Sequence, residues 1–282
     1  MARMFRPGSV WFVILTLLFT LHVAGQQGAR NGEWRVWGGD YGSTRYAPLD
    51  QINRDNVKNL KVAWTWRSDN FGSGPEYKSE TTPLMVNGVL YFTAGNRRAV
   101  IAADAGSGET LWTWRIDEGS RLEGGARRNS RGVAYWTDGK EERIIAVTPG
   151  YQIVALNAKT GHQIPNFGKD GIVDMFKELE KDANYDPAMT LMNTSPPMVS
   201  NDVIVVPTSL ANGRIPKSMK YTKGDIMAFD VRSGKRLWVF HTIPRRGEFG
   251  ADTWLNNSND YTGHAGAWPP FGQDSPSRGG PG

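Results

Sequence analysis

The stretch Ala228-Phe-Asp-Val-Arg-Ser-Gly-Lys-Arg-Leu-Trp238 decides how this chain folds. Its pattern is Ala-x-Asp, three residues, Gly, three residues, Trp. The pattern predicts a strand that ends at Asp230, a tight turn at Ser233-Gly234 and a returning strand that carries Trp238. Glycine suits the turn because it adopts positive φ angles that other residues resist. A single hairpin of this kind would be ordinary, so its recurrence is what matters.

Two further copies of the hairpin precede it in the chain. Ala102–Trp112 is a close copy, and Ala155–Pro165 is a degraded one, with Asn157 and Pro165 in place of Asp and Trp. The Asp or Asn positions of successive copies are 53 and then 73 residues apart. Units of roughly 40 to 50 residues built from strands are typical of β-propeller blades, and insertions lengthen some of them. We therefore predict an all-β propeller whose weakest visible blade junction is the one that lacks its Trp.

Each propeller unit is predicted to hold four strands. The strongest hairpin lies in Glu80–Thr93, where Asn87-Gly88 is a favoured two-residue turn. Successive units are expected over 80–115, 132–164 and 197–241, and a fourth unit is expected to begin near 263–268. The other predicted elements are a short helical turn over 52–60, a strand with one buried face over 60–66, and a short helix around Met175 to Lys181. Three units and a start do not close a ring, so only part of a propeller is expected here.

Residues 1–25 have the features of a secretory signal. Arg3 and Arg6 form a charged start, a mostly apolar run extends from 10 to 23, and small residues follow at 23–25. The apolar run is shorter than the roughly 20 residues that span a bilayer, which disfavours the alternative of a retained anchor. We predict a signal peptide over 1–25, a partial propeller domain over 26–282, and export to the periplasm without a transmembrane segment. The chain has no cysteine, so packing rather than disulfides must stabilise it there.

The charge of the chain does not indicate a nucleic-acid partner. The formal net charge of +5 falls to +3 when residues 1–25 are removed, because Arg3 and Arg6 leave with them. Such a small and dispersed excess of positive charge does not form the basic stripe or patch that nucleic acid binding requires. A local cluster at Arg127, Arg128 and Arg131 is either a solvated surface patch or part of a site, and we favour a functional role only for Arg131.

Several ordered motifs resemble one known family. Taken together they resemble the dehydrogenases that depend on pyrroloquinoline quinone (PQQ), and most of all their glucose dehydrogenase type. The motifs are Gly38-Gly-Asp-Tyr-Gly-Ser-Thr-Arg-Tyr-Ala-Pro-Leu49, Asn59–Trp66, Glu80–Tyr91, Ser130–Trp136 and Thr194-Ser-Pro-Pro197, with the hairpins above as the family's tryptophan-docking motifs. The resemblance implies the N-terminal portion of an eight-bladed propeller, with Trp112 and Trp238 buried between blades.

The resemblance also implies a cofactor site. PQQ is a planar tricarboxylate, so a guanidinium, hydroxyl donors and an aromatic surface suit it. A hard divalent ion, expected to be Ca²⁺, prefers carboxylate and amide oxygens. The resemblance assigns cofactor contacts to Glu80, Arg131, Thr194, Ser209 and Trp268, and a metal-ligand oxygen to Asn212. The plainer alternatives are a solvated acid at Glu80, a turn cap at Thr194 and inter-blade packing at Trp268.

The resemblance leaves the catalytic base unassigned. In the family an aspartate takes the proton of the substrate hydroxyl, and it and a partner lysine are expected beyond Gly282, so we expect this chain alone to be inactive. The family oxidises sugars or alcohols by hydride transfer to the quinone and passes electrons to an acceptor such as a quinone or cytochrome c. The paired cysteines of some alcohol-oxidising members are absent. The alternatives are a periplasmic propeller scaffold without cofactor and, less favoured, a lectin-like carbohydrate-binding propeller.

Overall fold

The computed structural model describes residues 28–68, 71, 79–121, 131–179, 191–192, 194–210, 222–263, 265–267 and 271–272. The predicted signal peptide lies outside these residues. Three four-stranded antiparallel sheets dominate the described part, and in each sheet the strands lie side by side in chain order. The first sheet, here blade 1, consists of β1 (Leu84–Val86), β2 (Val89–Ala94), β3 (Ala99–Asp104) and β4 (Thr110–Trp114).

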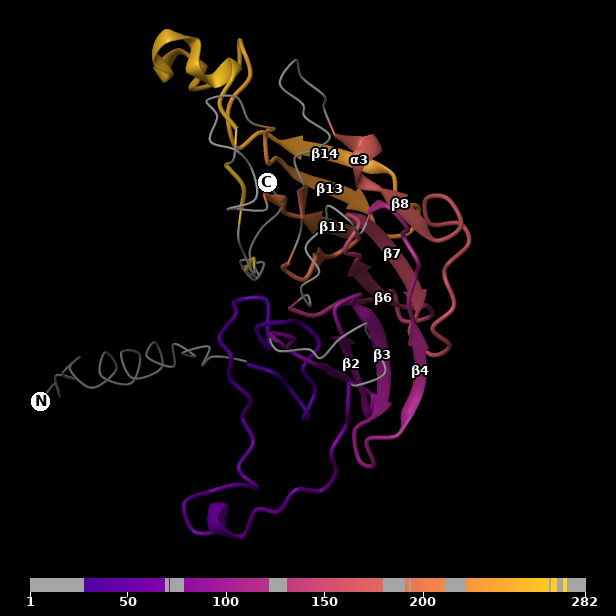
Figure 1. The fold of residues 1–282 in the computed structure, drawn as a ribbon. Coiled ribbons are helices and arrows are strands. Elements are labelled where there is room, and N and C mark those ends of the chain that lie inside the picture. Colours follow the sequence, from indigo (N-terminus) through magenta and orange to yellow (C-terminus); the bar gives the residue numbers. More distant parts are fainter. Residues whose placement is uncertain are drawn as a thin grey trace, which may run out of the picture.

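Blades 2 and 3 repeat the same arrangement. Blade 2 consists of β5 (Ala134–Thr137), β6 (Glu142–Val147), β7 (Gln152–Asn157) and β8 (Ile172–Asp174). Blade 3 consists of β10 (Met198–Ser200), β11 (Val203–Val206), β13 (Ile226–Asp230) and β14 (Arg236–Phe240). The three blades follow one another along an arc, in chain order from the lower to the upper part of Figure 1. The predicted all-β partial propeller is confirmed.

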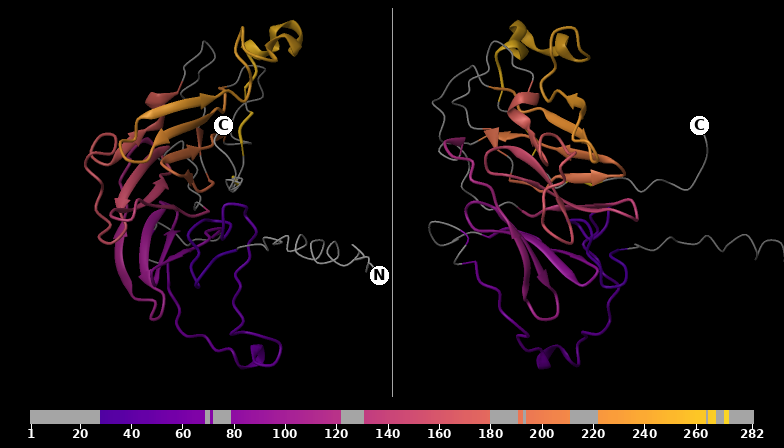
Figure 2. Two further views of the ribbon diagram at one scale, coloured as in Figure 1. Left: turned by 180° about the vertical axis from the view of Figure 1, so that it is seen from behind. Right: turned by 90° about the vertical axis from the view of Figure 1, so that its right-hand side faces the viewer.

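The remaining elements are short. A two-stranded ribbon pairs β9 (Leu191–Met192) with β12 (Ser209–Leu210). The predicted helical turn is the 3₁₀ segment η1 (Val57–Asn59), and the predicted short helix is α3 (Met175–Glu178), where the Asp174 side chain accepts a hydrogen bond from Phe176 N. Two more 3₁₀ segments, η2 (Ala251–Thr253) and η3 (Leu255–Asp260), follow blade 3. The segments around η1 and around η2 and η3 project away from the sheets (Figure 2).

The hairpin motif folds as predicted. The Asp104 carboxylate accepts hydrogen bonds from the backbone N–H groups of Gly106 and Ser107 at 3.1 and 2.7 Å, and Asn157 and Asp230 make equivalent turns. The motif glycines Gly108, Gly161 and Gly234 have φ angles of 76°, 71° and 72°. These left-handed angles explain why glycine recurs at the fourth position after Asp or Asn.

Tryptophan side chains cover the motif glycines of blades 1 and 2. The indole of Trp112 lies against Gly161 so closely that a Cβ there would come within 2.7 Å of it, and its Nε1 donates to Ala158 O at 2.9 Å. Trp64 makes the same contact with Gly108 and donates to Ala105 O at 3.1 Å. Apolar clusters between blades 1 and 2 and between blades 2 and 3 complete these junctions. The docking role of Trp112 is thereby confirmed.

Three details differ from the sequence prediction. The 60–66 segment forms no strand, since no described strand pairs with it, and Val62 is 83% exposed. The fourth strand of blade 2 is β8, downstream of the predicted 132–164 unit, and residue 163 joins the sheet only through an isolated bridge to Leu156. Pro165 lacks the N–H that would continue the hairpin there. Residues 263 and 265–267 form no strand; 264 and 268 lie outside the description.

Trp238 is also placed differently from the prediction. It lies on β14, the outer strand of blade 3, and it is 45% exposed rather than buried. Leu237 and Phe240 on the same strand are exposed as well. The equivalent Trp112 is partly buried by the next blade, and no described residues form a blade beyond β14.

Among the described residues, no helix combines the length and the apolarity that crossing a membrane would require.

Candidate functional site

The innermost strands of the three blades begin side by side. The residues that precede β1, β5 and β10 are joined by backbone hydrogen bonds: Thr82 N donates to Arg131 O at 2.9 Å, and Arg131 N donates to Thr194 O at 2.9 Å. Arg131 therefore stands between blade 1 and blade 3 at the same end of the sheets. Gly132 keeps this approach open, because a Cβ there would lie 2.9 Å from Thr82 O.

An ion pair occupies this end of the blades. Nη2 of Arg131 lies 3.2 Å from Oε2 of Glu80, and their side chains are 22% and 31% exposed. The pair is thus accessible to a ligand, although it is not fully solvated. A guanidinium can bind a carboxylate through two parallel hydrogen bonds, and the neighbouring Glu80 restricts its orientation. This geometry suits an anionic, planar ligand.

The structure brings three of the six predicted residues together. Glu80, Arg131 and Thr194 meet at the strand starts, as described above. Ser209 is connected to them through the backbone, since it pairs with Met192 in the β9–β12 ribbon, two residues before Thr194. Asn212 and Trp268 lie outside the described residues, so their predicted roles stay predictions.

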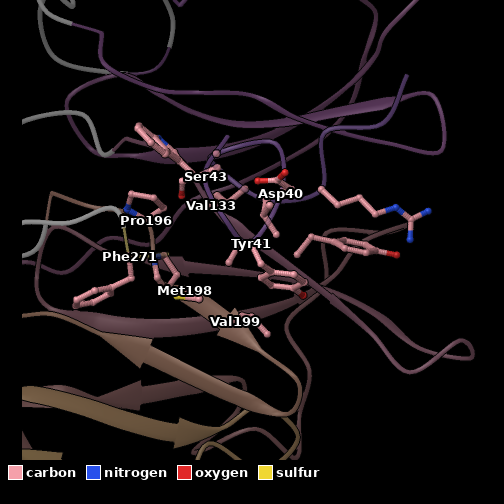
Figure 3. Close-up of a pocket in the computed structure, with 15 residues that line it drawn as sticks. Asp40, Tyr41, Ser43, Val133, Pro196, Met198, Val199 and Phe271 are labelled. Carbon is pink, nitrogen blue, oxygen red and sulfur yellow. The ribbon is translucent and has the colours of Figure 1, made fainter. Parts of the chain in front are cut away.

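A small cavity lies beside the same strands. Its walls come from residues 35–43 of the 34–50 segment, from residues 133–135 at the start of blade 2 and from residues 196–199 at the start of blade 3, with Phe271 at one side (Figure 3). Its volume is about 40 Å³, enough for a water molecule or two and too small for a tricyclic cofactor. The cavity is therefore a gap between the 34–50 segment and the inner strands rather than the cofactor position.

Polar groups from blade 1 hold the turn between β6 and β7 at this same end. The Glu118 carboxylate accepts from Thr148 Oγ1 at 2.6 Å and from Gly150 N at 2.7 Å. Burial raises the pKa of Glu118, and these hydrogen bonds and the nearby Arg121 and Arg98 oppose that rise. The sequence prediction missed this cluster, because a lone Glu after a strand and a Thr-Pro-Gly turn carry no distinctive pattern.

Buried groups of blades 2 and 3 also meet at this end. The hydroxyl of Tyr151 is hydrogen bonded to Oγ1 of Thr208, and neither residue is exposed. The carboxylate of Asp225 is paired with Arg245, with 2.5 Å between Oδ2 and Nη2. Within the described part of the chain, no group of three or more His, Cys, Asp or Glu side chains could hold a metal ion.

Comparison with known proteins assigns the family. Residues 34–278 match the PQQ domain family described as glucose/ethanol/alcohol dehydrogenase, beta-propeller domain. The chain belongs to this family. Membership in the PQQ family accounts for the three four-stranded sheets and for the docking hairpins together. It also confirms the resemblance drawn from the sequence motifs.

Individual relatives within the PQQ family are similar over most of this chain. The dehydrogenase subunit of the quinone alcohol dehydrogenase of Gluconobacter oxydans is 30% identical over 88% of this chain and 30% of its own length. The quinoprotein glucose dehydrogenase of Escherichia coli is 30% identical over 74% of this chain and 27% of its own length. The solved quinohemoprotein alcohol dehydrogenase of Comamonas testosteroni is 27% identical with a TM-score of 0.56, covering 77% of this chain and 28% of its own. The chain thus spans about 30% of these relatives.

Proposed function

We propose that this chain forms one side of the PQQ site of an exported dehydrogenase that oxidises a sugar or an alcohol. The observation that carries the proposal is the Arg131–Glu80 ion pair at the joined starts of three innermost strands. Membership in the PQQ family supports the cofactor. Since the relatives are about three times as long, the activity of the whole protein is part of the proposal.

The residues present fit PQQ. The accessible guanidinium of Arg131 would bind a carboxylate of the cofactor, and Glu80 would keep that guanidinium in place. The hydroxyl groups of Thr194 and Ser209 and the indole of Trp268 are proposed as further contacts. When bound, PQQ supplies a two-electron acceptor, and the protein supplies binding and orientation.

The metal, the location and the electron acceptor are finer parts of the proposal. We propose Ca²⁺ with Asn212 as one ligand, a periplasmic location reached through the segment 1–25, and electron transfer to a quinone or a cytochrome c. These rest on the sequence motifs and on family membership.

Titration with PQQ tests the proposal directly. The chain has 11 Trp residues, so quenching of their fluorescence by PQQ in the presence of Ca²⁺ would report binding. We expect saturable quenching in the wild type and at least about tenfold weaker binding in Arg131→Gln, because a charge-assisted pair is lost. Arg232→Gln is the matched control, since Arg232 forms its ion pair with Asp202 at the opposite end of blade 3. Absence of saturable quenching in a protein of the relatives' full length would favour the cofactor-free scaffold.

A further inference from the structure

Tyr151 has an unusual backbone for a large side chain. Its φ angle is 63°, in the left-handed region, and the residue is fully buried. It belongs to the 148–152 turn, which is closed by hydrogen bonds from Thr148 N to Gln152 O at 2.8 Å and from Tyr151 N to Thr148 O at 3.1 Å. Bulky residues adopt this conformation only where the surroundings hold them in it, and such strain concentrates at functional positions.

Blade 1 holds the 148–152 turn from one side. The Glu118 carboxylate binds Thr148 and Gly150 as described above, and Nη1 of Arg98 donates to the carbonyl oxygens of Val147 and Thr148 at 3.4 and 3.3 Å. Glu118 approaches so closely that a Cβ on Gly150 would lie 2.4 Å from its Oε1. The turn therefore has little freedom to relax the strain at Tyr151.

On the other side of the turn, the Tyr151 side chain lies between α3, which follows blade 2, and Thr208 of blade 3. The phenol ring packs against Phe176 with 5.4 Å between ring centroids, and the hydroxyl is hydrogen bonded to Thr208 Oγ1 across the boundary between blades 2 and 3. Burial raises the pKa of Tyr151, and the nearby Asp225 carboxylate raises it further, against the effect of the Thr208 hydrogen bond. The phenol therefore keeps its proton at neutral pH.

Thr208 stands directly before the β9–β12 ribbon. Ser209 in this ribbon pairs with Met192, and two residues later Thr194 accepts the backbone hydrogen bond of Arg131. A shift of Thr208 would thus move the ribbon against Arg131, which belongs to blade 2.

We propose that Tyr151 is a positioning residue for the candidate cofactor site: its hydroxyl fixes Thr208, and through it the ribbon that carries Ser209, relative to Arg131. This role of Tyr151 rests on the proposed function, because it assumes that the site binds PQQ. The simpler alternative, in which Tyr151 only fills the core between two blades, requires the ring but not the hydroxyl. Removal of the Tyr151 hydroxyl oxygen alone therefore distinguishes the two roles, since only the positioning role requires it.

The test compares Tyr151→Phe and Thr208→Val with Tyr91→Phe. Tyr91 is the matched control because it is also buried and its hydroxyl is also hydrogen bonded across a blade boundary. It donates to Ala158 O at 3.1 Å, but at the hairpin end of the blades. The first measurement is amide hydrogen exchange of residues 203–210 without PQQ, together with the free energy of unfolding of each variant. The second is the PQQ titration by Trp fluorescence.

We expect Tyr151→Phe and Thr208→Val to speed exchange in 203–210 and to weaken PQQ binding about tenfold each, the effect of one hydrogen bond. The double variant should be no worse than either single one, because both remove the same bond. Tyr91→Phe should change neither the hydrogen exchange of residues 203–210 nor the affinity for PQQ. Unchanged exchange in 203–210 and unchanged PQQ affinity would overturn the proposal, even if stability fell.

The two proposals fail in different ways. If the wild type does not bind PQQ, the proposed function is overturned together with the predicted effect on affinity, and local exchange still decides whether the hydroxyl fixes the ribbon. If the wild type binds PQQ and the variants bind equally well with equal exchange, the proposed function stands and the role of Tyr151 is overturned.

Discussion

The two junctions between the described blades use equivalent backbone carbonyls as acceptors but different side chains as donors. Between blades 1 and 2, Nε1 of Trp112 donates to Ala158 O, the carbonyl that follows Asn157 of the hairpin. Between blades 2 and 3, the equivalent carbonyl is Val231 O, and Nη1 of Arg143 donates to it and to Arg232 O, at 2.9 Å each. A guanidinium thus replaces the indole at the junction whose motif has Pro165 in place of Trp.

The guanidinium of Arg143 is held in place by burial, by an aromatic ring and by an ion pair. Arg143 is 2% exposed, its guanidinium lies 5.3 Å from the Trp136 ring centroid, and Glu141 pairs with it at 2.7 Å. The place over Gly234 is taken by Phe167 and Val173, whose atoms lie 3.3 and 2.6 Å from where a Cβ would be. The comparison shows that the hairpin determines where the neighbouring blade packs. One tryptophan both donates the hydrogen bond and covers the glycine at the first junction, whereas at the second junction Arg143 donates and Phe167 and Val173 cover the glycine.

The largest expected effect is a difference in stability between variants of Trp112, which the next blade covers, and of Trp238, which is exposed. Trp112→Ala should lower the free energy of unfolding by about 3 kcal/mol, because it opens a cavity over Gly161 and removes one donor to Ala158 O. Trp238→Ala should cost about 1 kcal/mol or less, because Trp238 is 45% exposed on the outer strand. Urea unfolding of both variants measures the difference. Equal losses would show that exposure does not separate the two positions.

The next effect concerns Arg143, the donor that replaces the indole at the junction of blades 2 and 3. Arg143→Met should lower the free energy of unfolding by about 2 kcal/mol, because the buried carbonyl of Val231 and the partly buried carbonyl of Arg232 lose their charged donor. Arg143→Lys keeps the charge and loses the planar fork, so we expect it to recover only part of the loss. Urea unfolding again provides the measurement. If Arg143→Met were as stable as the wild type, Phe167 and Val173 alone would hold the junction.

The smallest effect is a pH dependence at the junction of blades 1 and 2. Burial raises the pKa of Glu118, so the folded state binds its proton more tightly than the unfolded state does. Stability from this group is therefore greatest at low pH and falls as pH rises from the unfolded pKa through the raised folded one. Glu118→Gln should flatten the fall in unfolding free energy that sets in as the pH rises above about 4.5, the ordinary pKa of a glutamate. An identical pH profile in both proteins would contradict a raised pKa.

Local patterns predicted the parts of the fold that depend on local chemistry. The Asn87-Gly88 turn and the Asp104 hairpin follow from residues close together in sequence, and both formed. Leu60–Trp66 and Trp238 were predicted wrongly: pairing and burial depend on neighbouring segments, and no described strand pairs with 60–66 or covers the outer face of β14. A sequence pattern states what a segment can pair with, but it does not supply the partner.

The candidate site was only partly accessible from the sequence. Family motifs pointed to Glu80, Arg131 and Thr194, which the structure joins. Arg143, Glu118 and Tyr151 were missed, because each acts on a residue 30 or more positions away and none belongs to a recognisable pattern. Such contacts follow from how the blades stack, which no short stretch of sequence specifies.

The backbone hydrogen bonds that join Thr82, Arg131 and Thr194 have a consequence for how such sites can diversify. Because main-chain atoms hold the three strand starts together, these bonds do not depend on which side chains stand there. Randomising positions 80, 131 and 194 in a library should therefore yield many folded proteins with altered ligand preference. The same arrangement would let natural selection change what the site accepts while the scaffold around it stays the same.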